Sequence, residues 1–297
     1  MVFAFMLAMA AQGGSCDHTR EAALQEESRN ATNQRQYAIA ARHLEEAVAA
    51  CPESTASRVL LAGAYLMARQ PKQALAEAER VLKDHPAETA ALKVKGNSAY
   101  LLGDTGKAID TFIRLLDQHP ADDDGAYMLG RIYYQEGRID LAIGQFERAL
   151  KISPASYKAL DNLGLCYAAN GDDEKAMRYF LGAIKLVPDY EWPYINIADL
   201  LLKQGDARKA FDAASMASKR NPLSPRAFYT GAKALELLDK SEESLNWAQR
   251  AGALDPNYSD AWYLMARLYT KLGQEEKAKE AREKFLAAKA KEPPRRK

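Results

Sequence analysis

The chain has 297 residues, more than one hydrophobic core usually supports, so two domains or one elongated repeat array are expected. Hydrophobic residues make up 47% of the sequence and charged residues 27%, a balance that excludes wholesale disorder. The 41 Lys and Arg residues nearly cancel the 40 Asp and Glu residues, and a net charge of +1 gives no electrostatic reason to propose nucleic acid as a partner.

The N-terminal segment, residues 1–20, is predicted to be a leader. Residues 1–11 are apolar and uncharged, which suits the apolar region of a secretory signal, and Ala8-Met9-Ala10 is similar to a small-x-small cleavage site. No basic residue precedes the apolar run. We therefore predict export, as a periplasmic, secreted or lipid-anchored protein, with an apolar cytoplasmic tail as the alternative. Elsewhere no apolar run approaches the roughly 20 residues that span a bilayer, so membrane contact is expected only through this segment or a lipid on Cys16.

Prolines recur at a constant interval of 34 residues through most of the chain: Pro52, Pro86, Pro120, Pro154, Pro188, Pro222 and Pro256. This spacing divides the sequence into eight units, 21–54, 55–88, 89–122, 123–156, 157–190, 191–224, 225–258 and 259–292. The eighth unit carries Ala290 where the others carry proline, and the basic tail 293–297 follows it. A fixed period of this length indicates an array of structural repeats.

Each unit has the pattern of two helices joined by a turn. In the unit 157–190, apolar and small residues fall on one face of a first helix, Gly171 is suited to end that helix, and a second apolar stripe follows. The residues of the two stripes are Leu160, Leu163, Gly164 and Tyr167, then Ala176, Phe180 and Ala183. Such a pair cannot bury its apolar face alone and must stack on its neighbours.

These residues closely resemble the tetratricopeptide repeat, whose pattern the unit 157–190 matches at Leu163, Gly164, Tyr167, Ala176, Phe180, Ala183 and Pro188. The resemblance covers the eight units. It implies an all-α fold, a right-handed superhelical solenoid of helix-turn-helix repeats in which the first helix of each pair lines a concave groove. It also implies a scaffold that binds peptides or partner proteins.

The same resemblance places the groove at positions 2, 5, 9, 12 and 13 of each unit. From the fourth unit onward aromatic and basic side chains dominate these positions, and both kinds are enriched where binding energy concentrates. The alternative is that the aromatic rings pack against the adjacent unit. The predicted groove residues are Lys93, Asn97, Tyr127, Arg131, Tyr134, Lys158, Asp161, Trp192, Ile195, Asp199, Arg226, Tyr229, Lys233, Tyr263 and Arg267.

Cys16 and Cys51 are nearly equidistant from the turn of the first helix pair. In an antiparallel pair such residues lie side by side, so the two sulfur atoms are candidates for a disulfide. The alternatives are two unpaired thiols, or a lipid on Cys16. A disulfide and export are expected together, because disulfides persist in oxidising compartments. Cys166 is expected to be a packing residue.

No motif for catalysis, a metal or a cofactor occurs in the sequence, and the repeats leave too few residues for a catalytic domain. We therefore expect a non-enzymatic interaction scaffold that works in cell-envelope assembly, with no cofactor and with proteins or peptides as partners. One alternative is a cytosolic chaperone adaptor that clamps a C-terminal carboxylate. Lys93, Asn97 and Lys158 match the family's clamp pattern, whereas Met128 and Asn162 do not. A regulatory subunit of an enzyme complex is the other, and the oligomeric state stays open.

Overall fold

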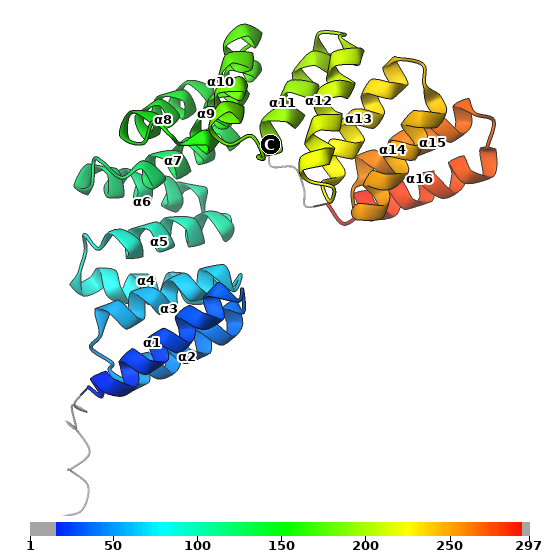
Figure 1. The fold of residues 1–297 in the computed structure, drawn as a ribbon. Coiled ribbons are helices and arrows are strands. Elements are labelled where there is room, and N and C mark those ends of the chain that lie inside the picture. Colours follow the sequence, from blue (N-terminus) through cyan, green and yellow to red (C-terminus); the bar gives the residue numbers. More distant parts are fainter. Residues whose placement is uncertain (1–15, 293–297) are drawn as a thin grey trace, which may run out of the picture. The chain divides into compact units, whose positions relative to one another are not determined.

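The computed structural model describes residues 16–292 and folds them into sixteen α-helices, with no strand among them (Figure 1). This confirms the predicted all-α repeat architecture. Most of the predicted leader and the tail 293–297 lie outside the described residues. Within the described part, no helix has the length and apolar character required to cross a membrane.

The helices alternate between a first and a second member of each pair. The first helices are α1 (His18–Asn33), α3 (Thr55–Met67), α5 (Thr89–Leu101), α7 (Asp123–Gln135), α9 (Tyr157–Ala169), α11 (Trp192–Lys203), α13 (Pro225–Leu237) and α15 (Ser259–Lys271). The second helices are α2 (Tyr37–Ala50), α4 (Pro71–Asp84), α6 (Thr105–Gln118), α8 (Ile139–Ile152), α10 (Asp173–Leu186), α12 (Ala207–Arg220), α14 (Ser241–Leu254) and α16 (Glu275–Lys289).

The helix starts follow the predicted 34-residue period. Six of the first helices begin at the residue that opens a unit, for example Thr55 and Tyr157. α1 begins earlier, at His18, because the Asp17 side chain accepts a hydrogen bond from the Arg20 N–H and caps the helix. The last three residues of the predicted leader therefore belong to the first helix.

The contacts divide the chain into two compact parts, each of several 34-residue repeats: the first unit, residues 1–136, and the second unit, residues 137–297. The first unit holds α1 to α7 and the second holds α8 to α16, so the boundary falls between the two helices of the predicted fourth repeat. Within each unit, each helix packs on the next helix along the chain. First helices also contact one another in the pairs α1–α3, α3–α5, α9–α11, α11–α13 and α13–α15.

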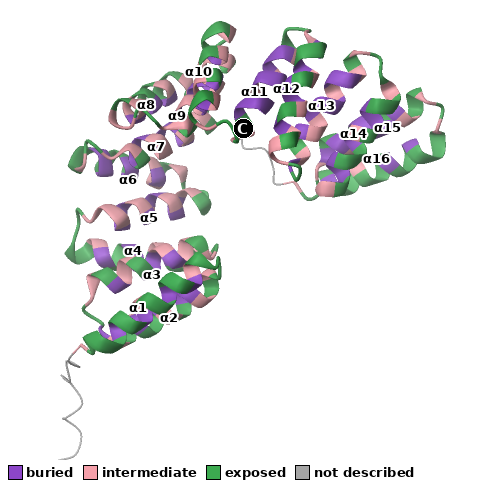
Figure 2. Cartoon of the chain, in the orientation of Figure 1, coloured by how far each residue is buried: buried purple, intermediate pink, exposed green. Residues whose placement is uncertain are grey.

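Small residues on the first helices let bulky rings enter from the second helices. A methyl group added at Gly164 of α9 would overlap the buried ring of Phe180 on α10, and Gly96 faces Phe112 of α6 in the same way. Buried residues accordingly run along the faces where the helices meet, while the outer faces are exposed (Figure 2). The alternation of small and large residues therefore sets how closely the helices pack.

At four of the prolines that recur every 34 residues, the backbone carbonyl accepts a hydrogen bond from a side chain of the following repeat. Arg58 Nη2 donates to the Pro52 carbonyl at 2.8 Å, and Arg114 Nη2 donates to Pro86 at 2.8 Å. In the second unit the donors are Tyr194 Oη and Arg220 Nε on Pro188, at 3.1 and 2.5 Å, and Trp262 Nε1 on Pro256, at 3.0 Å. These bonds satisfy backbone carbonyls that the turns leave without helical partners.

Candidate functional site

In the second unit the predicted groove residues lie on the first helices α9, α11, α13 and α15, which contact one another in that order. Trp192 is 44% exposed at the start of α11, and Tyr263 is 51% exposed on α15. Trp and Tyr are enriched among the residues that contribute most to binding at protein interfaces. These two are the most exposed aromatic side chains of this surface, although one side of the Tyr263 ring meets Phe285 of α16, with ring centres 5.4 Å apart.

The charged residues between these rings pair with one another. Arg226 Nη2 on α13 lies 2.6 Å from Asp199 Oδ2 on α11, and the Thr230 hydroxyl donates to Asp199 Oδ1 at 3.3 Å. One repeat further on, Arg267 Nη2 on α15 lies 2.9 Å from Glu236 Oε1 on α13. Two of the four basic residues predicted for the groove in this unit, Arg226 and Arg267, are therefore paired with a carboxylate of the preceding first helix.

Cationic side chains of the same first helices lie close to aromatic rings of their own helix. Lys233 Nζ lies 5.7 Å from the centre of the Tyr229 ring, and the Arg267 guanidinium lies 5.9 Å from the Tyr263 ring. Lys158 Nζ, which is exposed, stands 5.8 Å from the ring of Tyr157. Tyr229 also meets the edge of Tyr258, with ring centres 5.2 Å apart, and burial raises its pKa to about 12. Tyr229 is thus half-buried: one part of its ring packs against Tyr258, and the rest is open to solvent.

Two predicted groove residues are instead buried. Ile195 is 1% exposed and packs with Tyr194, Ala217 and Ala227, so it belongs to the core between repeats. Asp161 is 3% exposed on α9, where its Oδ1 accepts a hydrogen bond of 2.8 Å from Asn196 Nδ2 on α11. Burial raises the pKa of Asp161 to about 7, against the lowering effect of that amide. Neither side chain is open to a ligand.

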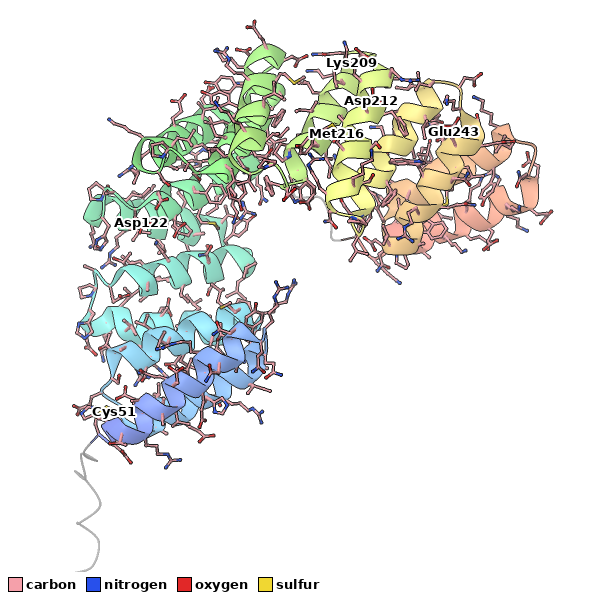
Figure 3. The ribbon with its side chains drawn as sticks, in the orientation of Figure 1. Cys51, Asp122, Lys209, Asp212, Met216 and Glu243 are labelled. Carbon is pink, nitrogen blue, oxygen red and sulfur yellow. A yellow bond between two sulfur atoms is a disulfide. The ribbon has the colours of Figure 1, made fainter. Side chains whose placement is uncertain are left out.

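The first unit carries the remaining predicted residues on α5 and α7. Lys93 Nζ forms ion pairs with Asp122 Oδ2 at 2.8 Å and Asp124 Oδ2 at 3.2 Å, and Asp122 is labelled in Figure 3. The Arg131 guanidinium lies 5.9 Å from the Tyr127 ring. Asn97 and Tyr134 are half-buried.

Family models identify the repeats directly. Four tetratricopeptide repeat models match residues 31–97, 95–122, 127–191 and 248–280, which together cover most of the described chain. The chain belongs to the tetratricopeptide repeat family. No curated protein matches the sequence.

Solved tetratricopeptide repeat structures share this fold at low sequence identity. A tetratricopeptide repeat protein from Parabacteroides merdae is 19% identical with a TM-score of 0.68, over 85% of this chain and 99% of that one. PilW, a type IV pilus biogenesis factor, is 20% identical with a TM-score of 0.65, over 72% of this chain and 99% of that one. In the Cut9–Hcn1 assembly of APC/C, the matching chain is 13% identical with a TM-score of 0.67, over 91% of this chain and 53% of that one.

Exposed aliphatic residues at position 13 of the repeats escaped the sequence analysis, which concentrated on aromatic and basic side chains. Met67 ends α3 at 48% exposure, Leu101 ends α5 at 58%, and Leu237 ends α13 at 61%. Their common phase in the 34-residue repeat is the signal that would have revealed them. They add apolar area at the carboxyl ends of the first helices.

The structure joins Cys16 to Cys51 by a disulfide with a Cα–Cα distance of 4.3 Å. Cys51 caps the C-terminal end of α2 and is buried, and Cys16 comes directly before Asp17, the residue that caps the start of α1. Asp17 N–H donates to the Ala50 carbonyl at 3.0 Å beside the bridge. The bridge thus lies at the end of the first pair opposite its turn, and Cys166 is a buried free thiol on α9.

Proposed function

We propose that the protein is a non-enzymatic scaffold that holds extended peptides or partner-protein segments against the first helices of its repeats. The observation that carries this is the exposure of Trp192 and Tyr263 on a surface where Arg226 and Arg267 are already paired with carboxylates. Exposed aromatic anchors favour apolar and aromatic side chains of a partner, with its polar backbone meeting the rim.

We further propose that the scaffold works at the cell envelope. The leader predicted for residues 1–20, with its apolar run 1–11, and the bridge between Cys16 and Cys51 support this placement, because both suit an oxidising compartment. PilW, a type IV pilus biogenesis factor, has the same fold.

A chaperone adaptor is the weaker candidate. A carboxylate clamp needs a free ammonium group at Lys93, but that group already pairs with Asp122 and Asp124. Lys158 is exposed and retains the capacity to bind an anion. No observation in the structure favours a regulatory subunit of an enzyme complex over a general scaffold.

The test is selection of a binding peptide followed by mutation of the two anchors. A random peptide library is selected on the tag-free protein, and the affinity of the best peptide is measured by calorimetry. The variant Trp192→Ala/Tyr263→Ala is expected to bind that peptide at least ten times more weakly, because truncating central aromatic anchors costs about 2 kcal/mol or more.

A matched control removes exposed apolar side chains from second helices. Leu181 of α10 and Leu286 of α16 are 52% and 64% exposed, so Leu181→Ala/Leu286→Ala deletes a similar apolar area elsewhere. This control is expected to bind like the wild type, and circular dichroism should show equal helix content in all three proteins. Equal affinity of the anchor variant and the wild type would assign peptide binding to another surface.

A further inference from the structure

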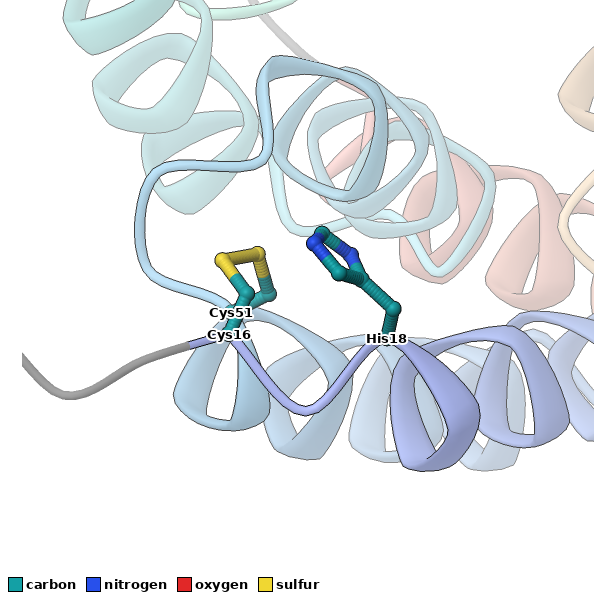
Figure 4. Close-up of side chains that lie close together, drawn as sticks. All are labelled: Cys16, His18 and Cys51. Atoms are coloured by element: carbon teal, nitrogen blue, oxygen red, sulfur yellow. A yellow bond between two sulfur atoms is a disulfide. The ribbon is translucent and has the colours of Figure 1, made fainter.

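Three side chains that bind metals meet where α1 begins. Cys16 Sγ, Cys51 Sγ and one ring nitrogen of His18 all lie within 4.8 Å of one another, and Figure 4 shows the imidazole directed toward the two sulfur atoms. Among residues 16–292 this is the one group of three such side chains close enough to hold an ion. His18 is exposed, so an ion reaches the group from solvent.

A buried carboxylate orients the imidazole. His18 Nδ1 lies 3.3 Å from Glu21 Oε2, and Glu21 in turn accepts a hydrogen bond of 2.6 Å from the Ser57 hydroxyl. The Gln25 side-chain amide also lies 3.3 Å from Glu21 Oε1, so the carboxylate is held in place by partners on both α1 and α3. A carboxylate on one ring nitrogen fixes the histidine tautomer and leaves the other nitrogen to bind a metal. Here the nitrogen left over is Nε2.

We propose that Cys16, Cys51 and His18 form a Zn²⁺ site when their disulfide is reduced, with Glu21 as the positioning residue for His18 and water as the fourth ligand. Zinc prefers a tetrahedral set of thiolate and imidazole donors, at about 2.3 and 2.0 Å, which spaces the donors by roughly 3.5–3.8 Å. In the disulfide the two sulfur atoms are bonded, so they must move apart to reach that spacing after reduction, while the His18 nitrogen already lies within 4.8 Å of both. Cys16 precedes α1, where the backbone has no helical hydrogen bond to break.

The chemistry requires a reductant, for which a cellular dithiol suffices. The dithiol supplies two electrons and two protons, the bond between the two sulfurs breaks, two thiols form, and the dithiol becomes a disulfide. Zn²⁺ then replaces one proton on each thiol and takes the lone pair of Nε2, so two protons are released on binding.

Both the disulfide and the zinc site would connect the start of α1 to the end of α2. In an oxidising compartment the disulfide holds the first helix pair closed, and in a reducing one the metal ion does so. The proposal concerns this end of the first repeat and does not depend on the peptide surface.

The experiment uses the full tag-free chain, reduced with a phosphine under anaerobic conditions and titrated with Co²⁺ as a spectroscopic probe. We expect thiolate-to-cobalt charge-transfer absorption that saturates at one ion per chain and disappears when Zn²⁺ is added. The oxidised protein, in which non-reducing peptide mapping should recover a Cys16–Cys51 pair, is expected to show no such absorption.

Four variants distinguish the ligands. Cys16→Ser, which lies outside every helix, should abolish the charge-transfer band or reduce it to that of a single thiolate. His18→Ala should weaken Zn²⁺ binding at least tenfold, and Glu21→Gln by about 10-fold to 100-fold. Cys166→Ser should leave binding unchanged, because burial raises the pKa of that thiol to about 12.

Three results would overturn the proposal. The first is the absence of a charge-transfer band in the reduced wild type. The second is a band that Cys16→Ser leaves unchanged, and the third is an affinity for Zn²⁺ that His18→Ala does not alter.

Discussion

At the scale of single residues, Asp161 is a carboxyl group that the repeat fold buries almost completely. It lies at a position that the repeat pattern assigns to the groove, yet the packing of α9 against α11 encloses it with one amide donor, Asn196. Burial raises its pKa from an ordinary 3.8 to about 7. The folded protein therefore holds this proton more tightly than the unfolded chain does, and the stability of the wild type falls as the pH rises from about 4 to about 7.

Asp161→Asn is expected to remove this loss. The substituted side chain can accept the same hydrogen bond from Asn196 without bringing a charge into the interior. The advantage of the variant over the wild type in free energy of unfolding should grow by roughly 2–4 kcal/mol between about pH 4 and pH 8. Urea denaturation across that range measures it. Asp212→Asn, which alters an exposed carboxylate on α12, should follow the wild-type pH profile. A constant difference between Asp161→Asn and wild type would show that the folded state does not hold the proton.

At the scale of helices, the close approach of α9 and α10 depends on the missing side chain of Gly164. Gly164→Ala is expected to destabilise the protein by about 1–3 kcal/mol, because the added methyl group would overlap the Phe180 ring in a closely packed interface. Gly144→Ala, on the exposed face of α8 with no atom near the added methyl, is expected to stabilise it by about 0.5–1 kcal/mol. Opposite shifts of the urea midpoint would support this account, and two shifts of the same sign would contradict it.

The helices could be predicted from the sequence, whereas the burial and the ion pairing of the groove residues could not. A constant proline interval and phased small residues fix where helices start and which faces pack, as Thr55 and Gly164 illustrate. The burial of Ile195 and the pairing of Arg226 with Asp199 depend on how far one helix slides along the next. That offset comes from packing in three dimensions, and a position number within a single repeat does not contain it.

At the scale of the whole molecule, a repeat protein should tolerate the loss of one complete repeat. Deleting residues 157–190 removes α9 and α10 together and joins two equivalent unit boundaries, so each remaining repeat keeps neighbours of the same kind. The shortened protein is expected to keep the same helix content per residue by circular dichroism and to stay monodisperse. Deleting residues 157–172, which removes α9 alone, should expose the apolar face of α10 and cause aggregation. A full-repeat deletion that unfolds the protein would indicate a core that repeats do not share equally.

The hydrogen bonds to the proline carbonyls all have the same sense along the chain. In each observed case the acceptor belongs to one repeat and the donor to the repeat that follows, as with Pro188 and Arg220 or Pro256 and Trp262. A fragment cut at two of these boundaries would therefore have two chemically different ends. Its carboxyl end would present a proline carbonyl that has lost its donor, and its amino end would present a guanidinium, phenol or indole donor that has lost its acceptor. The two ends are complementary to each other, so these bonds favour head-to-tail joining of separate fragments.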